Sequence, residues 1–141
     1  MMALDMDAYL DGDGSVIERA VSQVLDVLGQ NNVMLVPYVD CHSYQPGTSQ
    51  AILACFAQIV PRVCKRALFD RLVIIGGETS QTIFRELRVE HLSLRRALEP
   101  GVAQGYILDG LLAGKEFALK GGSMGSLTAL EKMMGRQEVD Y

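Results

Sequence analysis

The sequence has little of what stabilises secreted or membrane proteins: no tryptophan, four prolines and three cysteines. The cysteines, Cys41, Cys55 and Cys64, cannot all pair with one another, so a disulfide framework is not expected. No signal peptide opens the chain, and no apolar run reaches the about 18 residues that a membrane-spanning helix needs. The chain is therefore expected to be soluble in the reducing cytoplasm, with no membrane partner.

Positive charge is also scarce. The 13 lysines and arginines face 17 aspartates and glutamates, which gives a formal charge of −4. Without a basic tail or stripe the chain is not expected to bind nucleic acid. What it has instead is 49% hydrophobic residues in 141 positions, enough for the core of one ordinary domain over residues 1–141.

Apolar spacing predicts helices that alternate with short buried strands. Predicted helices are Ser15–Leu28, Thr48–Leu68, a stretch that follows Ser80 and ends near Leu87, and a final helix capped by Ser126. Predicted strands are Val33–Val39, Arg71–Ile75, His91–Ala97, Val102–Leu108 and Glu116–Leu119. Pro61 is expected to kink or split the second helix. This order predicts an α/β fold with three layers: a mostly parallel sheet flanked by helices, with an added β-hairpin near the C-terminal half.

A glycine pair stands between the predicted strand Arg71–Ile75 and the helix after it. Backbone N–H groups and the positive end of that helix would converge on an anion near Gly76 and Gly77, which outlines a phosphate site. Thr79 and Ser80 could add hydroxyl donors. The plainer alternatives are that one of them is only the helix N-cap, and that the glycines simply permit a tight turn.

A second glycine cluster, Gly121, Gly122 and Gly125, follows another predicted strand. Lys120 at the end of that strand could meet a phosphate as a point charge, or be an ordinary solvated lysine. Neither cluster has the spacing of a Walker A loop or of the dinucleotide-binding fingerprint. Two such loops in one small domain still favour a nucleotide-phosphate site.

Two other groups of polar residues leave alternatives open. Asp40-Cys41-His42 invites a metal or nucleophile interpretation, in which the chain would be a different α/β enzyme. Against it, adjacent residues of an extended chain point to opposite sides, and no further ligands have metal-site spacing. Glu99, before a Pro-Gly turn, could contact a ribose hydroxyl or magnesium, or lie in solvent.

Three segments in this order resemble the C-terminal half of the four-carbon acid sugar kinase family. They are Leu72-Val73-Ile74-Ile75-Gly76-Gly77-Glu78-Thr79-Ser80, Glu99-Pro100-Gly101-Val102 and Lys120-Gly121-Gly122-Ser123-Met124-Gly125. The sequence departs from the family pattern at two places. Gly121 follows Lys120 directly where the family usually has a serine, and Met124 stands where phenylalanine is usual.

The resemblance implies an ATP-binding domain that, with Mg²⁺, serves a kinase acting on acids such as erythronate, threonate or 3-oxo-tetronate. The N-terminal domain that binds the sugar acid is expected to be absent, so the chain alone should have little activity and an exposed docking patch that favours a homodimer. A non-catalytic nucleotide-binding or scaffold module derived from such a kinase is the alternative. No catalytic residue or metal ligand is assigned. The residues expected to hold the nucleotide are Gly76, Gly77, Glu78, Thr79, Ser80, Lys120, Gly121, Gly122 and Ser123.

Overall fold

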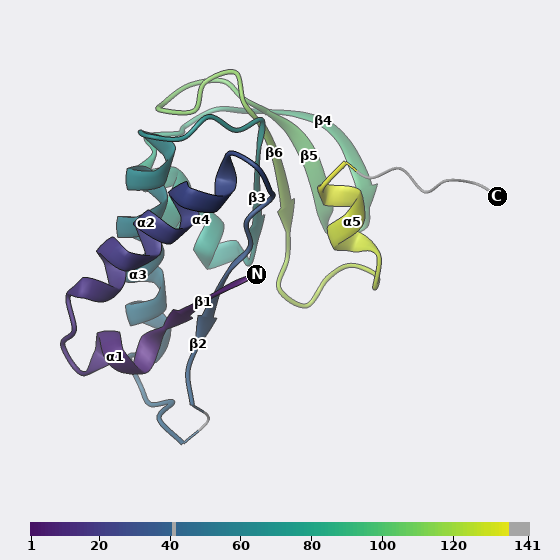
Figure 1. Ribbon diagram of the computed structural model, residues 1–141. Coiled ribbons are helices and arrows are strands. Elements are labelled where there is room, and N and C mark those ends of the chain that lie inside the picture. Colours follow the sequence, from purple (N-terminus) through teal and green to yellow (C-terminus); the bar gives the residue numbers. More distant parts are fainter. Residues whose placement is uncertain (41, 136–141) are drawn as a thin grey trace. The chain divides into compact units, whose positions relative to one another are not determined.

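A computed structural model describes residues 1–40 and 42–135 of the chain (Figure 1). The chain divides into two compact units, Met1–Phe69 and Asp70–Tyr141. Each unit has its own sheet and its own helices. Among the described residues, no helix combines the length and the apolar character that crossing a bilayer requires.

The first unit contains a two-stranded parallel sheet and three helices. Its elements are β1 (Met2–Asp5), α1 (Met6–Leu10), α2 (Ser15–Leu28), β2 (Leu35–Tyr38) and α3 (Thr48–Cys64). Pro37 lies within β2 opposite Leu4, which a strand with one neighbour tolerates because its other edge needs no donor. The helix at 15–28 is thus confirmed, whereas the strand predicted at 33–39 is shorter and the helix predicted at 48–68 ends at Cys64. The elements β1 and α1 were not predicted.

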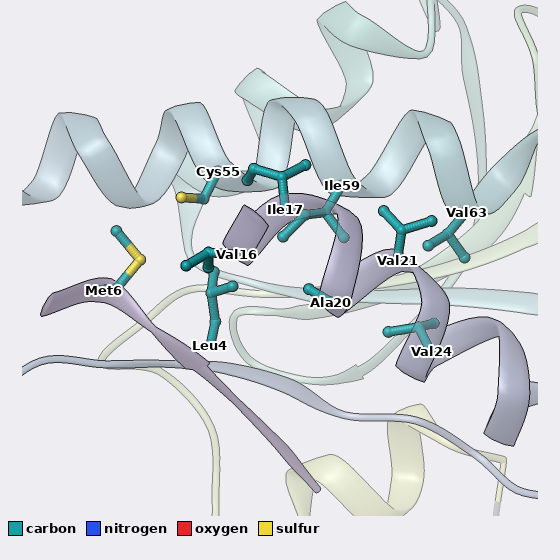
Figure 2. Close-up of a cluster of buried hydrophobic side chains, with 10 residues drawn as sticks. All are labelled: Leu4, Met6, Val16, Ile17, Ala20, Val21, Val24, Cys55, Ile59 and Val63. Carbon is teal, nitrogen blue, oxygen red and sulfur yellow. The ribbon is translucent and has the colours of Figure 1, made fainter. Parts of the chain in front are cut away.

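The core of this unit lies between α2 and α3, with β1 beside them. Figure 2 shows Ile17 and Val21 of α2 on the side of α3, and Val16 beside Leu4 of β1. Pro61 does not split α3: it lies near the end of the helix, and its carbonyl still accepts from Lys65 N at 3.0 Å. The buried residues of the cluster are Leu4, Met6, Val16, Ile17, Ala20, Val21, Val24, Cys55, Ile59 and Val63.

The second unit contains a four-stranded mixed sheet and two helices. Its elements are β3 (Arg71–Ile75), α4 (Gly77–Glu86), β4 (Leu92–Glu99), β5 (Val102–Ile107), β6 (Glu116–Lys120) and α5 (Ala129–Met133). The strand order is β3-β6-β5-β4, in which β3 and β6 are parallel and the other two pairs are antiparallel. The hairpin predicted near the C-terminal half, over Val102–Leu119, is present as the antiparallel pair β5 and β6, and β4 pairs with β5 on the other side.

The α/β class is confirmed, but the prediction of one mostly parallel sheet is wrong. The described strands form two separate sheets, and two of their four pairings are antiparallel. The apolar runs marked the strands correctly and did not reveal their partners. Strand β6 inserts between β3 and β5, and nothing local in its five residues specifies that position.

The two helices of the second unit cover opposite faces of its sheet. Neighbouring residues of β6 point to opposite sides. Phe117 packs edge-on against Phe84 of α4, with ring centroids 6.2 Å apart, whereas Ala118 joins a buried cluster with Ala129 and Met133 of α5. We call these the α4 face and the α5 face.

The final helix is shorter than predicted. It begins at Ala129 with Thr128 as its N-cap, so Ser126 does not cap it, and the side chain of Leu127 is fully exposed. Within this helix Met133 is buried and Leu130 is not. Ser126 has a different partner, Glu99.

Candidate functional site

The two glycine loops lie side by side in the second unit. Strands β3 and β6 are parallel neighbours, so their carboxyl ends meet at one edge of the sheet (Figure 1). The N–H of Gly76 donates to the carbonyl of Lys120 at 2.8 Å. Val102, the first residue after the Pro-Gly turn, is paired with Lys120 as well. All three motif segments therefore converge on the edge where ligands of open α/β sheets usually bind.

The first loop exposes the N-terminus of α4. Helix α4 begins at Gly77, and Gly76 holds φ of +108°, a backbone conformation that favours glycine. No side chain caps this end, so the alternative in which Thr79 or Ser80 is the N-cap is wrong. The hydroxyl of Ser80 instead donates to the carbonyl of Gly77 at 2.8 Å. The first N–H groups of the helix remain available for an anion.

A cavity of about 380 Å³ opens between the α4 N-terminus, the second loop and the Pro-Gly turn. Four of the predicted site residues line it: Gly77, Ser80, Lys120 and Gly121. The other five, Gly76, Glu78, Thr79, Gly122 and Ser123, are not among its lining residues. The cavity residues that our sequence reasoning did not assign to the site are Ala97, Glu99, Pro100, Gly101, Val102, Ala103 and Leu119.

Some of these unassigned cavity residues belong to a motif that could be recognised in the sequence. The turn Glu99-Pro100-Gly101-Val102 was recognised as a motif, and short strands were predicted on both sides of it. The structure pairs Ala97 with Ala103 across β4 and β5, through a register shift between Ala97 and Glu99 that the sequence does not reveal. Two small residues facing each other leave room above the sheet, and only the structure shows that these two are paired.

Lys120 curls over its own loop. Its ammonium donates to the carbonyls of Gly121 at 2.8 Å and Gly122 at 3.3 Å. The side chain is half-buried beside the cavity. It therefore brings a positive charge to the second loop, and a bound phosphate would compete with these carbonyls for it.

Glu99 ties the Pro-Gly turn to the segment after the second loop. Its carboxylate accepts from the N–H of Ser126, from the Ser126 hydroxyl at 2.9 Å and from Lys132 Nζ at 3.1 Å. The hydrogen bond from the Ser126 N–H, together with Lys132 and the Ser126 hydroxyl, lowers the pKa of Glu99. Both oxygens of Glu99 thus accept hydrogen bonds from within the protein. This differs from the alternatives in which Glu99 contacts a ribose hydroxyl or magnesium, or lies in solvent.

Replacing Glu99 with glutamine should loosen this connection. We expect the Ser126 amide to exchange its hydrogen at least about tenfold faster, because the bonds are no longer charge-assisted. In the wild type the lowered pKa means that the carboxylate stabilises the fold above its ordinary value of 4.5, and that this contribution is lost as the pH falls through the folded-state pKa. Hydrogen-exchange mass spectrometry of Glu99→Gln against Glu86→Gln, an exposed carboxylate of α4, tests this. Equal Ser126 exchange in both variants would contradict it.

Met124 joins the Pro-Gly turn to the second loop by packing. A Cβ atom on Gly101, whose φ is +78°, would lie 2.6 Å from Met124 Cβ, and one on Gly121 would lie 2.9 Å from Met124 Cγ. The thioether side chain therefore occupies the space above both glycines. Met124 stands where the family that the sequence resembles usually has phenylalanine, and it fills this space with a flexible apolar side chain.

The alternative based on Asp40-Cys41-His42 gains no geometric support from the described residues. Asp40 Oδ1 accepts from the backbone N–H of His42 at 2.8 Å, as in a turn, and Cys41 lies outside the described residues. Burial raises the pKa values of the Cys55 and Cys64 thiols to about 11. These two cysteines therefore behave as packed hydrophobes rather than as reactive thiols.

A separate polar group holds the start of β4. Asp109 accepts from the backbone N–H groups of Glu90 and His91, at 2.8 and 3.2 Å, and its Oδ2 lies 2.7 Å from His91 Nδ1. Glu90, His91 and Asp109 are close enough to contact one ion. Both oxygens of Asp109 already take part in hydrogen bonds with residues 90 and 91, and Glu90 and His91 are exposed. We therefore interpret the group as hydrogen bonds that stabilise the start of β4, not as a metal site.

The hydrogen bond and negative charge of Asp109 raise the pKa of His91. In Asp109→Asn we expect this pKa to fall toward the ordinary 6.5. A raised pKa means that the pair stabilises the fold below the unfolded-state pKa and that this contribution is lost as the pH rises through the folded-state pKa. NMR titration of the imidazole measures the change, with Glu90→Gln as the control for a weaker charge effect. An unchanged pKa in Asp109→Asn would contradict the assignment.

Residues 1–130 match the family model described as the nucleotide-binding C-terminal domain. The chain belongs to this family. The match confirms the resemblance to the C-terminal nucleotide-binding domain, and with it a nucleotide as the ligand. A search of curated proteins gave no match.

Solved structures share the fold of this nucleotide-binding domain. Haemophilus influenzae protein HI1011, of family DUF1537, matches with a TM-score of 0.77 and 21% identity over 95% of this chain and 34% of its own. A Salmonella typhimurium LT2 protein provisionally named a tRNA synthase matches at 0.69 and 20%, over 92% and 34%. A DUF1537 protein from Bordetella bronchiseptica, crystallised with citrate as a domain-swapped dimer, matches at 0.69 and 15%, over 92% and 33%. The chain thus spans about one third of the length of these proteins.

Proposed function

We propose that the chain is the ATP-binding part of a kinase that phosphorylates four-carbon acid sugars of the erythronate, threonate or 3-oxo-tetronate type. The observation that carries this proposal is the convergence of the three motif segments on one cavity, at the carboxyl ends of β3 and β6. In this proposal a further domain of a longer protein or complex binds the sugar acid. The length of the DUF1537 relatives, about three times that of this chain, supports such an arrangement.

The residues have distinct tasks in this proposal. The backbone at Gly76–Ser80 and the uncapped end of α4 bind phosphate oxygens, while the loop Lys120–Ser123 contributes a positive charge from the other side. Mg²⁺ would supply neutralisation of the phosphate charge. Glu78, an exposed carboxylate in the first turn of α4, is the residue of the predicted set that can hold the ion, directly or through water.

Phosphoryl transfer requires both substrates to be positioned together. The chain alone should therefore bind ATP and ADP without transferring phosphate to a sugar acid. Calorimetric titration with each nucleotide in the presence of Mg²⁺ tests the first part, and a phosphorylation assay with erythronate and threonate tests the second. Saturable binding is expected, and a chain that binds neither nucleotide would overturn the proposal.

The alternative is a non-catalytic nucleotide-binding or scaffold module. The altered loop, in which Gly121 follows Lys120 directly, is the observation that favours it. The two functions separate when the chain is combined with a sugar-acid-binding domain of a four-carbon acid sugar kinase. Restored transfer supports the kinase, and nucleotide binding without transfer supports the scaffold.

We further propose that the chain works in the cytoplasm and forms a homodimer. Three cysteines suit a reducing compartment, and a domain that docks onto a partner leaves a surface open for self-association. Sedimentation analysis over a range of chain concentrations measures the oligomeric state. A monomer at every concentration would contradict the homodimer.

A further inference from the structure

The floor of the cavity is a row of side chains that crosses the sheet. The register pairs Leu119 with Ala103, and Ala103 with Ala97, so the row passes over β6, β5 and β4. All three side chains line the cavity. Because Ala118, next to Leu119, belongs to the α5 face, the row lies on the α4 face. The cavity therefore extends from the start of α4 across the strands to the far edge of the sheet.

The two ends of this row differ in chemistry. One end carries polar groups: the N-terminus of α4, the Ser80 hydroxyl and the Lys120 ammonium. The other end is the alanine pair, Ala97 and Ala103, which offers no side-chain donor. Glu99 lies nearby, but its charge is engaged by Ser126 and Lys132. A ligand with an anionic end and a less polar end thus has one favoured direction.

The dimensions suit a nucleotide laid across the strands. Neighbouring strands are about 4.8 Å apart, so the path from the end of β3 to β4 covers three spacings, or about 14 Å. Small side chains at the far end leave the floor flat. Ala97 is exposed and Ala103 is half-buried, so a larger side chain at Ala97 would project into the cavity without disturbing the core.

We propose that the nucleoside part of the ligand, its base and ribose, lies on the alanine pair Ala97–Ala103, with the phosphates directed toward α4 and Lys120. This inference rests on the proposed nucleotide site and assigns an orientation within it. The alanine pair is a platform that contacts the flat, apolar face of the base, and its small size provides the room. A nucleotide then gains affinity over the bare phosphate chain from this end of the cavity.

The test compares ADP with inorganic tripolyphosphate, which has the phosphates and no nucleoside. Ala97→Leu should weaken ADP binding at least about tenfold and leave tripolyphosphate binding unchanged. Ala113→Leu makes the same change at an exposed residue outside the cavity and should alter neither. Calorimetry gives the affinities, and thermal melting of both variants establishes that the fold is kept.

The outcomes separate this inference from the function on which it rests. Equal ADP affinity in Ala97→Leu and the wild type would overturn the platform and leave the nucleotide site standing. Weaker binding of tripolyphosphate would also overturn it, because the phosphates would then lie at the alanine end. If the wild type binds neither ligand, the proposed function itself fails and the platform with it.

Discussion

Gly77→Val is expected to weaken ADP binding at least about 100-fold while leaving the melting temperature close to that of the wild type. Gly77 is the first residue of α4 and lines the cavity. A Cβ atom there meets no other heavy atom within 4 Å, so the valine fits the fold and its methyl groups project into open space. They would hold a phosphate away from the N–H groups that should bind it. Calorimetric titration with ADP measures the loss.

Gly29→Val is the matched control for this experiment. It places the same side chain at the C-terminal cap of α2, where a Cβ atom also meets nothing within 4 Å. ADP affinity should be unchanged there. If Gly77→Val bound ADP as tightly as the control does, the phosphates would not lie at the start of α4, and the proposed site would have to be abandoned.

Phe117→Ala is expected to lower the free energy of unfolding of the second unit by about 3–5 kcal/mol. Phe117 is fully buried on β6 and meets Phe84 of α4 edge to face, with ring planes at 84°. A loss of this size is a large fraction of the about 5–15 kcal/mol that holds a typical domain folded. Urea denaturation followed by circular dichroism measures it. Because Phe117 helps to hold α4 on the sheet, ADP binding should weaken together with stability.

Leu94→Ala is the control for the core substitution. The register links Leu94 to Gly105 and Gly105 to Phe117, so both side chains belong to the same face of the sheet, but Leu94 is 69% exposed. Its removal should change the free energy of unfolding by no more than about 0.5 kcal/mol. Similar losses in both variants would mean that Phe117 is not the packing centre of this face.

The strand before each glycine loop could be predicted because its signal is local. The run Arg71–Ile75 is apolar and β-branched, and the structure confirms it as β3. The helix predicted after Ser80 is present, but it begins already at Gly77. The segment Met2–Leu10 shows the opposite case. Its β1 and α1 are four and five residues long, too short for a periodic pattern to stand out.

The candidate site likewise has residues that local motifs predict and residues whose place only the structure shows. Gly77, Ser80, Lys120 and Gly121 belong to local motifs, and they do line one cavity. Thr79 was expected as a hydroxyl donor to phosphate or as a cap, and it neither caps α4 nor lines the cavity. Sequence reasoning could name loops that line the cavity, but not which residues of a loop turn toward it, since that depends on the backbone path.

The sequence by itself determined the strands that lead into the glycine loops, the Pro-Gly turn and the kind of ligand, because each depends on residues close together in the chain. Only the tertiary structure decided that β6 lies between β3 and β5, that Glu99 holds Ser126 across 27 positions, and that alanines floor the cavity. These features are pairings between distant residues. Their free energy depends on the whole sheet and its packing, so no local pattern specifies them.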